Sequence, residues 1–543
     1  MHKILRGMVI GAAATLVVGH GCPAFAASCG DSDNSGAVAI NDVVLHLRVV
    51  SGIDAAASIC GNAGYANCAN LNGDGAGPTD ISDTVLLLRQ ASNVANCPSD
   101  QCLPRTVLAG CPGTATLPSN ITGNLVIPAG CDARVNGVTN VTAGAVLTVE
   151  PGAVVKGNAG LTPPSVLIVR PGGRINAVGS AGQPITWTSS NAPGARASED
   201  WGGVALLGNA PVNEPGISIE GLTDGFFGGT KVDDFSGCMS YNRIQFSGRE
   251  LTPDNELNLF QMAGVGNRTQ LDHIQAHVGA DDGIEWFGGT VNMSYVVSSS
   301  AGDDNFDHQL GWTGGLQFGL IAQRAALVES GGSNGFEMDN SEFGADNLPR
   351  SAGKYCNVTA IGARYSGDNP GVTNQFGVFS RRGNAMTIAN TIVKDFRNGG
   401  YQMRDASTAA RACINGTTLN TTAPVGVIQN SLFTDNGATG NEQAVNHSSC
   451  DTPGECACTT TEHYALLQAQ RNVLSTADAS VEAIGGNTFP PTNLVPTPGS
   501  LADTHPAADC TQINGSFVSA PYIGAFEPGG ADWTAGWTEY PLN

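Results

Sequence analysis

The sequence predicts an all-β protein in which short strands stack as the coils of a parallel β-helix. Glycine is abundant, with 72 residues among 543, and only 13% of the residues are charged, which is typical of a turn-rich β protein. Apolar strands that end in proline and glycine recur about every twenty residues between 125 and 172. A strand that alternates apolar and polar residues is then written three times, at 283–287, 305–309 and 335–339.

The first residues have the features of a secretory signal peptide. A basic start precedes an apolar run from Met8 to Val18 and the small-residue sequence Ala24-Phe25-Ala26, so we expect cleavage after residues 1–26. Cys22 would be lost with this segment, which leaves fourteen of the 15 cysteines, and an even number in an exported protein predicts disulfides. No other apolar run is long enough to span a membrane. The expected location is extracellular or on the cell surface.

The charge of the chain argues against one class of partner. The formal net charge is -22 and the isoelectric point is about 4.6. Nucleic-acid binding depends on clustered lysine and arginine that neutralise phosphates, so nucleic acid is not an expected partner. Calcium suits this charge better, because its protein ligands are oxygen atoms.

Residues 28–97 contain a loop and an apolar helix pattern, written twice at an offset of 41 residues. A calcium loop offers oxygens at positions 1, 3 and 5, a backbone carbonyl at 7 and a carboxylate at 12, with glycine at 6. The first copy fits this pattern, whereas the second begins with asparagine and carries its last carboxylate at position 14. Polar turns that only cap helices would not require ligands at alternating positions. The predicted calcium ligands are Asp31, Asp33, Ser35, Ala37, Asp42, Asn70, Asn72, Asp74, Ala76 and Asp83.

This repeat pair resembles a type I dockerin, a small α-helical domain of the EF-hand-like kind. The resemblance implies two calcium loops and a cohesin-like or other surface anchoring partner. Ile40-Asn41 and Ile81-Ser82 stand where dockerins commonly carry a small hydroxyl pair for cohesin recognition, which is a departure from the dockerin pattern.

Residues 98–122 are rich in proline and predict a linker or cap, and residues 123–543 predict the β-helix with loop insertions. Candidate loops lie at 208–240, 339–375 and 406–424. The repeats between 125 and 189, the box at 281–289 and the ending at 522–538 resemble secreted bacterial right-handed parallel β-helix proteins. This resemblance implies the architecture of nearly all of 123–543.

Two later strands, at 377–381 and 400–404, align with the three central ones by their glycines. Successive coils lie about 4.8 Å apart, so equivalent residues form columns on the outer face. Carboxylates at that spacing raise one another's pKa, which creates a proton donor unless a cation such as calcium intervenes. The first predicted column is Glu285, Asp307, Glu337, Phe379 and Gln402. The second is Phe287, Gln309, Asp339, Arg381 and Arg404.

A long face with acids, arginines and aromatic rings suits a polysaccharide. One hypothesis is a glycan hydrolase or lyase whose catalytic groups are Asp307, Glu337, Asp339 and Arg381, within a groove that includes Glu285, Phe287, Gln309, Gln402 and Arg404. The alternative is a non-catalytic surface or matrix protein, in which outward acids keep the wall soluble and Asp and Asn at the turns bond the backbone. The paired aspartates at 281–282 and 303–304 are superficially similar to those of polygalacturonase-like β-helices, but the accompanying motifs of those enzymes are absent. The sequence leaves both hypotheses open.

Overall fold

The computed structural model describes residues 105–222, 224–252, 255–324, 333–363, 375–405, 460–475 and 493–543, with short stretches between 407 and 445. All of them belong to one compact unit, Ala95–Asn543. The predicted signal peptide and the predicted calcium-binding module lie outside the described residues. No helix in the described part of the chain is long and apolar enough to cross a membrane.

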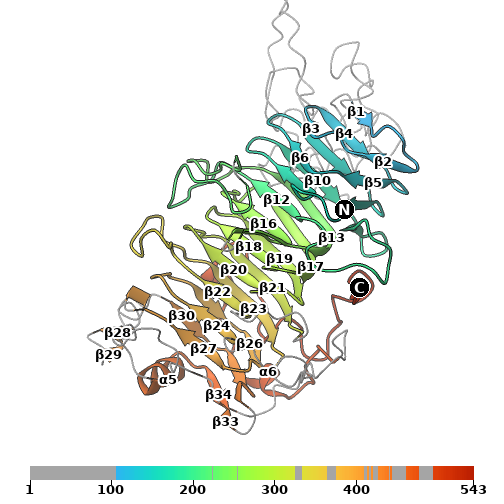
Figure 1. Ribbon diagram of the computed structural model, residues 1–543. Coiled ribbons are helices and arrows are strands. Elements are labelled where there is room, and N and C mark those ends of the chain that lie inside the picture. Colours follow the sequence, from blue (N-terminus) through green and yellow to red (C-terminus); the bar gives the residue numbers. More distant parts are fainter. Residues whose placement is uncertain are drawn as a thin grey trace, which may run out of the picture. The chain divides into compact units, whose positions relative to one another are not determined.

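One ten-stranded sheet within the described residues forms a continuous parallel ladder (Figure 1). Each coil contributes one strand, and every strand pairs in parallel with the strands of the coils before and after it. Its strands in chain order are β3 (Asn120–Ile121), β6 (Val138–Val141), β9 (Val166–Val169), β12 (Val204–Leu207), β16 (Phe260–Ala263), β18 (Ile284–Phe287), β20 (Phe306–Gln309), β22 (Phe336–Met338), β24 (Phe376–Ser380) and β27 (Gly399–Met403).

An eighteen-stranded sheet, counted over the same residues, closes the other sides of the coils. Its named pairings are also parallel, so the predicted all-β parallel β-helix is confirmed. Its strands are β1 (Arg105–Val107), β2 (Thr114–Thr116), β4 (Asn124–Ile127), β5 (Asp132–Val135), β7 (Val146–Val149), β8 (Val154–Gly157), β10 (Arg174–Val178), β11 (Ile185–Ser189), β13 (Gly237–Ser247), β17 (Gln270–Gly279), β19 (Asn292–Ser299), β21 (Gly315–Ala322), β23 (Lys354–Ile361), β25 (Thr387–Ala389), β26 (Ile392–Lys394), β30 (Val427–Gln429), β31 (Leu432–Thr434) and β34 (Val473–Ser475).

The remaining elements are short. Within the described residues, three antiparallel hairpins join β14 (Arg249–Thr252) to β15 (Asn255–Leu257), β28 (Cys413–Ile414) to β29 (Thr418–Leu419), and β32 (Gly437–Ala438) to β33 (Asn441–Glu442). The described helices are α5 (Thr460–Ala469), α6 (Leu501–Thr504) and α7 (Cys510–Ile513).

The first coil of the β-helix lies before residue 123, where the sequence predicts the β-helix to begin. The described part of the stretch predicted as a linker or cap, 98–122, forms the first coil, because β1, β2 and β3 pair with β4, β5 and β6 of the next coil. Cys111 and Cys131 form a disulfide that joins these two coils.

Single residues in the left-handed backbone conformation bend the long strands, so that one sheet can cover two sides of a coil. They are Tyr241 in β13, His273 in β17, Tyr295 in β19 and Phe318 in β21, with φ between 49° and 62°. Their rings stack from coil to coil, with centroids 4.1, 4.6 and 4.8 Å apart. Such contacts contribute about 0.5–1.5 kcal/mol each, which offsets the strain of a positive φ in a bulky residue.

The inner faces of the central strands build the core. Trp286, Phe306 and Phe336 are fully buried, and Trp286 stacks on Trp312 with ring centroids 4.6 Å apart. The outward residues of the same strands are also largely buried, since Asp307 is only 8% exposed. Other parts of the chain therefore cover the outer face of the ten-stranded sheet around Asp307.

The C-terminal segment 515–543 packs on the outer side of the other sheet. Gln275 donates a hydrogen bond to the carbonyl oxygen of Glu539 at 2.8 Å, and the ring of His277 bonds the carbonyl of Pro541 at 2.9 Å. A second disulfide, between Cys356 and Cys510, ties β23 to α7. The C-terminal segment thus covers part of the eighteen-stranded sheet, whereas the acidic residues gather over the ten-stranded sheet.

Candidate functional site

The first predicted column forms as expected. Glu285 lies opposite Asp307, Asp307 opposite Glu337, and Glu337 opposite Phe379 in the parallel register. Phe379 is in turn paired with Gln402. The periodicity of the sequence therefore predicts which side chains are neighbours on five successive coils.

The second column follows the same order at the ends of these strands. Phe287 is paired with Gln309. The backbone N–H of Arg381 donates to the carbonyl of Met338, and that of Arg404 donates to Ser380, so each coil continues the register of the one before. Asp339, which directly follows Met338, consequently lies beside Arg381.

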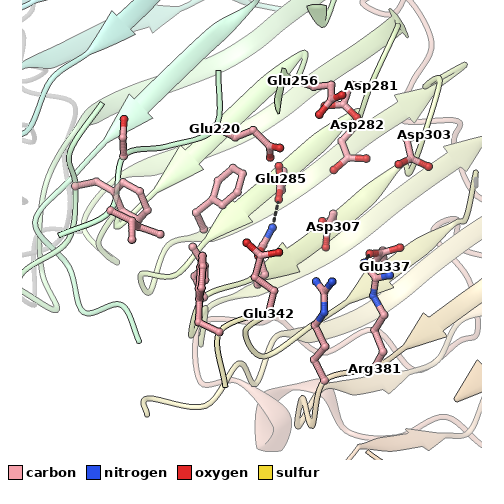
Figure 2. Close-up of a pocket in the computed structure, with 18 residues that line it drawn as sticks. Glu220, Glu256, Asp281, Asp282, Glu285, Asp303, Asp307, Glu337, Glu342 and Arg381 are labelled. Carbon is pink, nitrogen blue, oxygen red and sulfur yellow. Dashed lines mark hydrogen bonds and ion pairs between the residues drawn. The ribbon is translucent and has the colours of Figure 1, made fainter. Parts of the chain in front are cut away.

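A groove of about 450 Å³ opens over these columns. Its floor carries Glu285, Asp307 and Glu337 from β18, β20 and β22. Two loops from the sides of the β-helix form walls, with Glu220 and Phe227 from 208–236 and Glu342 and Phe343 from 339–353. Figure 2 shows Asp281, Asp282 and Asp303 at one end and Arg381 at the other.

The arginine end is a closed network of ion pairs. The Nε of Arg381 lies 2.9 and 3.0 Å from the two carboxylate oxygens of Asp339, and its Nη2 bonds Glu337. Arg382 adds a contact of 2.6 Å to Asp339. Burial raises the pKa of Asp339 to about 7 although Arg382 opposes the shift, and burial lowers the pKa of Arg381 to about 10. Asp339 and Arg381 are thus engaged with each other, while Glu337 remains at the surface of the groove.

A ladder of polar side chains runs along the turn that precedes these strands. Asn258 accepts from the backbone N–H of Asp282 at 3.1 Å, and Asp282 accepts from that of Asp304 at 2.8 Å. Asp304 accepts from Asn334 in the same way, and Asn334 accepts from Phe376 at 2.9 Å. Each side chain satisfies a backbone donor of the next coil, so Asp282 and Asp304 have a structural role.

Glu285 and Asp307 differ in their hydrogen-bond partners. Glu285 accepts from Asn258 and from the Nε2 of Gln309, the latter at 2.9 Å. No described residue donates to the buried Oδ1 of Asp307. Burial, followed by the charges of neighbouring acids, raises the pKa of both groups well above the ordinary range. A buried carboxyl oxygen without described donors is a poor place for a negative charge, so burial favours the protonated form of Asp307 as it does that of Glu285.

The same acids have the spacing of a cation site. Oxygen atoms of Asp282, Glu285 and Asp307 lie within 4.8 Å of one another, as do those of Asp281, Asp282 and Asp303. An all-oxygen donor set suits calcium or magnesium. The buried and unsatisfied Oδ1 of Asp307 fits such an ion as well as it fits a proton.

Three further glutamates, Glu220, Glu256 and Glu342, come from two loops and a hairpin above the floor. Burial and the neighbouring charges of Glu256 and Glu342 raise the pKa of Glu220 to about 7. Sequence reasoning missed these three residues, together with Phe343 and Arg382. They lie outside the repeated strands, and their approach depends on loop conformations that carry no periodic signal.

We expect the Glu220→Gln substitution to flatten the dependence of stability on pH. The folded protein holds a proton on Glu220 up to a pH of about 7, whereas the unfolded chain loses it near the ordinary pKa of 4.5. The proton on Glu220 therefore contributes to the free energy of unfolding at low pH, and this contribution declines as the pH rises from about 4.5 to about 7. Urea midpoints measured across this range would show a smaller decline for the variant.

Glu527→Gln provides the control for this measurement. Glu527 is exposed and lies on the C-terminal segment, away from the groove, so its substitution should leave the profile of the parent protein unchanged. Identical profiles for Glu220→Gln and the parent protein would contradict the assignment of a proton to Glu220.

Comparison with known proteins identifies the family to which this architecture belongs. A family model described as a pectate-lyase like beta helix domain matches residues 119–466, which is more than half of the chain. No curated protein and no solved structure matches the chain significantly. The matched range contains the whole ten-stranded sheet and the floor of the groove, and it suggests a polysaccharide-associated role. The chain belongs to the pectate-lyase-like β-helix family.

Proposed function

We propose that the groove binds a polysaccharide and hydrolyses it. The observation that carries this proposal is the pair formed by Asp307 and Glu337. They are register neighbours on adjacent coils, at the floor of a groove, in a family whose fold suggests a polysaccharide-associated role. Glycoside hydrolases usually use two carboxyl groups in unlike environments, one as the general acid and the other as the nucleophile or base.

Asp307 is the proposed general acid. No described residue donates to its buried Oδ1, and its pKa is raised mainly by burial, so it keeps a proton to give to the glycosidic oxygen. The leaving sugar then departs with that proton as its bond to the anomeric carbon breaks.

Glu337 is the proposed partner carboxylate. Its ion pair with Arg381 holds the side chain in place beside the groove. Asp339 fixes Arg381 through two further contacts, so Asp339 and Arg381 act as positioning residues for Glu337 and do not themselves carry the reaction. This assignment refines the catalytic set expected from the sequence.

Elimination is the less suitable reaction for this groove. A lyase needs a base together with positive charge near the carboxylate of a uronic acid. Arg381 and Arg382 are the arginines that line the groove, and both are ion-paired with Asp339. Hydrolysis uses the carboxyl groups that the floor does present.

A non-catalytic glycan-binding or matrix role is the second candidate. The close oxygen atoms of Asp282, Glu285 and Asp307 favour it, because a calcium ion held there would occupy the proposed acid. Such an ion would order the floor and bridge to hydroxyl groups of a bound glycan.

Asp307→Asn and Glu337→Gln should each abolish release of reducing ends from a responsive polysaccharide. The expected loss is at least about a thousandfold, since each variant removes one of the two groups that the reaction uses. Reducing-sugar assays on a broad panel of glycans provide the measurement, with Glu527→Gln as the active control.

The alternatives give different results in the same experiment. Full activity in both variants would exclude the acid and base roles. Absence of cleavage across the panel, together with calcium binding that Asp307→Asn weakens, would favour the non-catalytic role.

We expect cleavage to retain the anomeric configuration. Asp307 and Glu337 lie on adjacent coils, at a spacing of about 4.8 Å, and retaining enzymes place their carboxyl groups about 5–5.5 Å apart. Glu337 would then attack the anomeric carbon directly, and water would release the glycosyl intermediate. Proton NMR of the freshly formed product tests this, because initial appearance of the opposite anomer would require a wider separation.

The N-terminal repeat is the proposed calcium-binding and anchoring part of a secreted bacterial protein. The signal-like start and the disulfides Cys111–Cys131 and Cys356–Cys510 support export. Isothermal titration of the full chain should give a calcium stoichiometry that falls by about one site in Asp31→Ala and in Asp33→Ala. An unchanged stoichiometry in both variants would remove the claim for the first loop.

A further inference from the structure

We infer that the groove takes a glycan that carries positive charge, that is, a polymer of amino sugars. This inference rests on the proposed function and names its substrate class. Among the described residues that line the groove, nine carry a carboxyl group and two carry a guanidinium group. Both guanidinium groups are already paired with acids, so the formal charge of the described lining is negative.

The acids converge on the groove from separate parts of the fold. Glu285 and Asp307 rise from the floor, whereas Glu220, Glu256 and Glu342 come from two loops and a hairpin. Residues that serve only solubility spread over a surface, but these side chains surround one space (Figure 2). Bringing them together is electrostatically unfavourable in the free protein, and a cationic ligand would relieve that repulsion.

An unsatisfied acceptor inside the groove points independently to a ligand with donors. Asp307 is 8% exposed, it lines the groove, and its Oδ1 has no hydrogen-bond donor among the described residues. A protonated amino group offers three N–H donors and a positive charge to such an oxygen. A uronic acid offers a carboxylate at the same place, and a carboxylate has no hydrogen-bond donor for this oxygen.

Phe343 supplies a surface for the sugar ring itself. Its side chain is 61% exposed at the groove, although a phenylalanine gains more from burial. Hydrogen bonds hold its loop in place: Ser341 accepts from the backbone N–H of Phe343 at 3.1 Å and donates to Glu214 at 3.0 Å. Asn340 donates to the carbonyls of Ala345 and Asn347 at 3.0 and 3.1 Å.

The loop therefore presents an aromatic ring beside the carboxylate of Glu342. An aromatic face packs against the apolar face of a sugar and attracts a neighbouring cation. The pair of Phe343 and Glu342 thus matches a sugar ring that bears an ammonium group.

Binding by the intact Glu337→Gln protein tests the inference without turnover. The probes are oligomers of glucosamine, N-acetylglucosamine and galacturonic acid of equal length. Isothermal titration is carried out at about pH 6, where a primary amine is protonated, with a chelator and then with added calcium. We expect the glucosamine oligomer to bind at least about tenfold more tightly than the other two, and more weakly as salt is added.

Two further substitutions locate the recognition. Adding Glu342→Gln should weaken binding of the glucosamine oligomer but not of the acetylated one, and adding Phe343→Ala should weaken both. Adding Glu527→Gln should change neither, because that carboxylate lies on the C-terminal segment. Equal losses for both oligomers in Glu342→Gln would contradict recognition of the charge.

The results separate this inference from the proposed function. Equal or tighter binding of the neutral oligomer overturns the positive charge of the substrate and leaves glycan hydrolysis standing. Binding of the galacturonate oligomer, whether it requires calcium or not, overturns the inference in favour of an acidic glycan. If no oligomer binds and no glycan in the panel is cleaved, the proposed function fails and the inference fails with it.

Discussion

The parallel hydrogen-bond register between coils is the constraint on which the rest of this structure depends. Because the strands pair without slipping from β16 to β24, a residue type repeated once per coil becomes a column of adjacent side chains. A slip of one residue would exchange the inner and outer faces, and would bury Glu285 in the place of Trp286. The aromatic core therefore fixes the register, and the register brings the outward acids within a few ångströms of one another.

The closely spaced acidic side chains have three kinds of environment. At the turn, Asp282 and Asp304 accept hydrogen bonds from the backbone of the next coil. At the arginine end, Asp339 is held by two guanidinium groups. In the centre, Glu285 accepts from Asn258 and Gln309, while none of the described residues donates to the Oδ1 of Asp307. That difference matters for function, because an unsatisfied carboxyl group on a groove floor is available to a ligand or a proton.

Those parts of the structure that repeat could be predicted from the sequence, and those that do not repeat could not. Alternation along 283–287 and its copies identifies the inner and outer faces, and the shared glycines give the register of both columns. Glu220 and Phe343 reach the groove through single loops whose conformation depends on contacts such as that between Ser341 and Glu214. The bends at left-handed residues could not be predicted either. Glycine in a sequence indicates that a positive φ is possible, whereas tyrosine, histidine and phenylalanine rarely adopt one.

The position of the candidate catalytic pair follows from how charge is distributed along the β-helix axis. Carboxyl groups gather over β18 and β20, and arginines follow strands β24 and β27. Asp307 lies on the last coil of the acidic part, and Glu337 lies on the next coil, where Arg381 reaches it. One step of the backbone ladder thus separates a carboxyl group whose pKa is raised by burial from one that is ion-paired. A β-helix with uniform outer charge would place equivalent acids in equivalent environments, and neighbouring acids would not differ in the way that the proposed proton donor Asp307 and the proposed nucleophile Glu337 do.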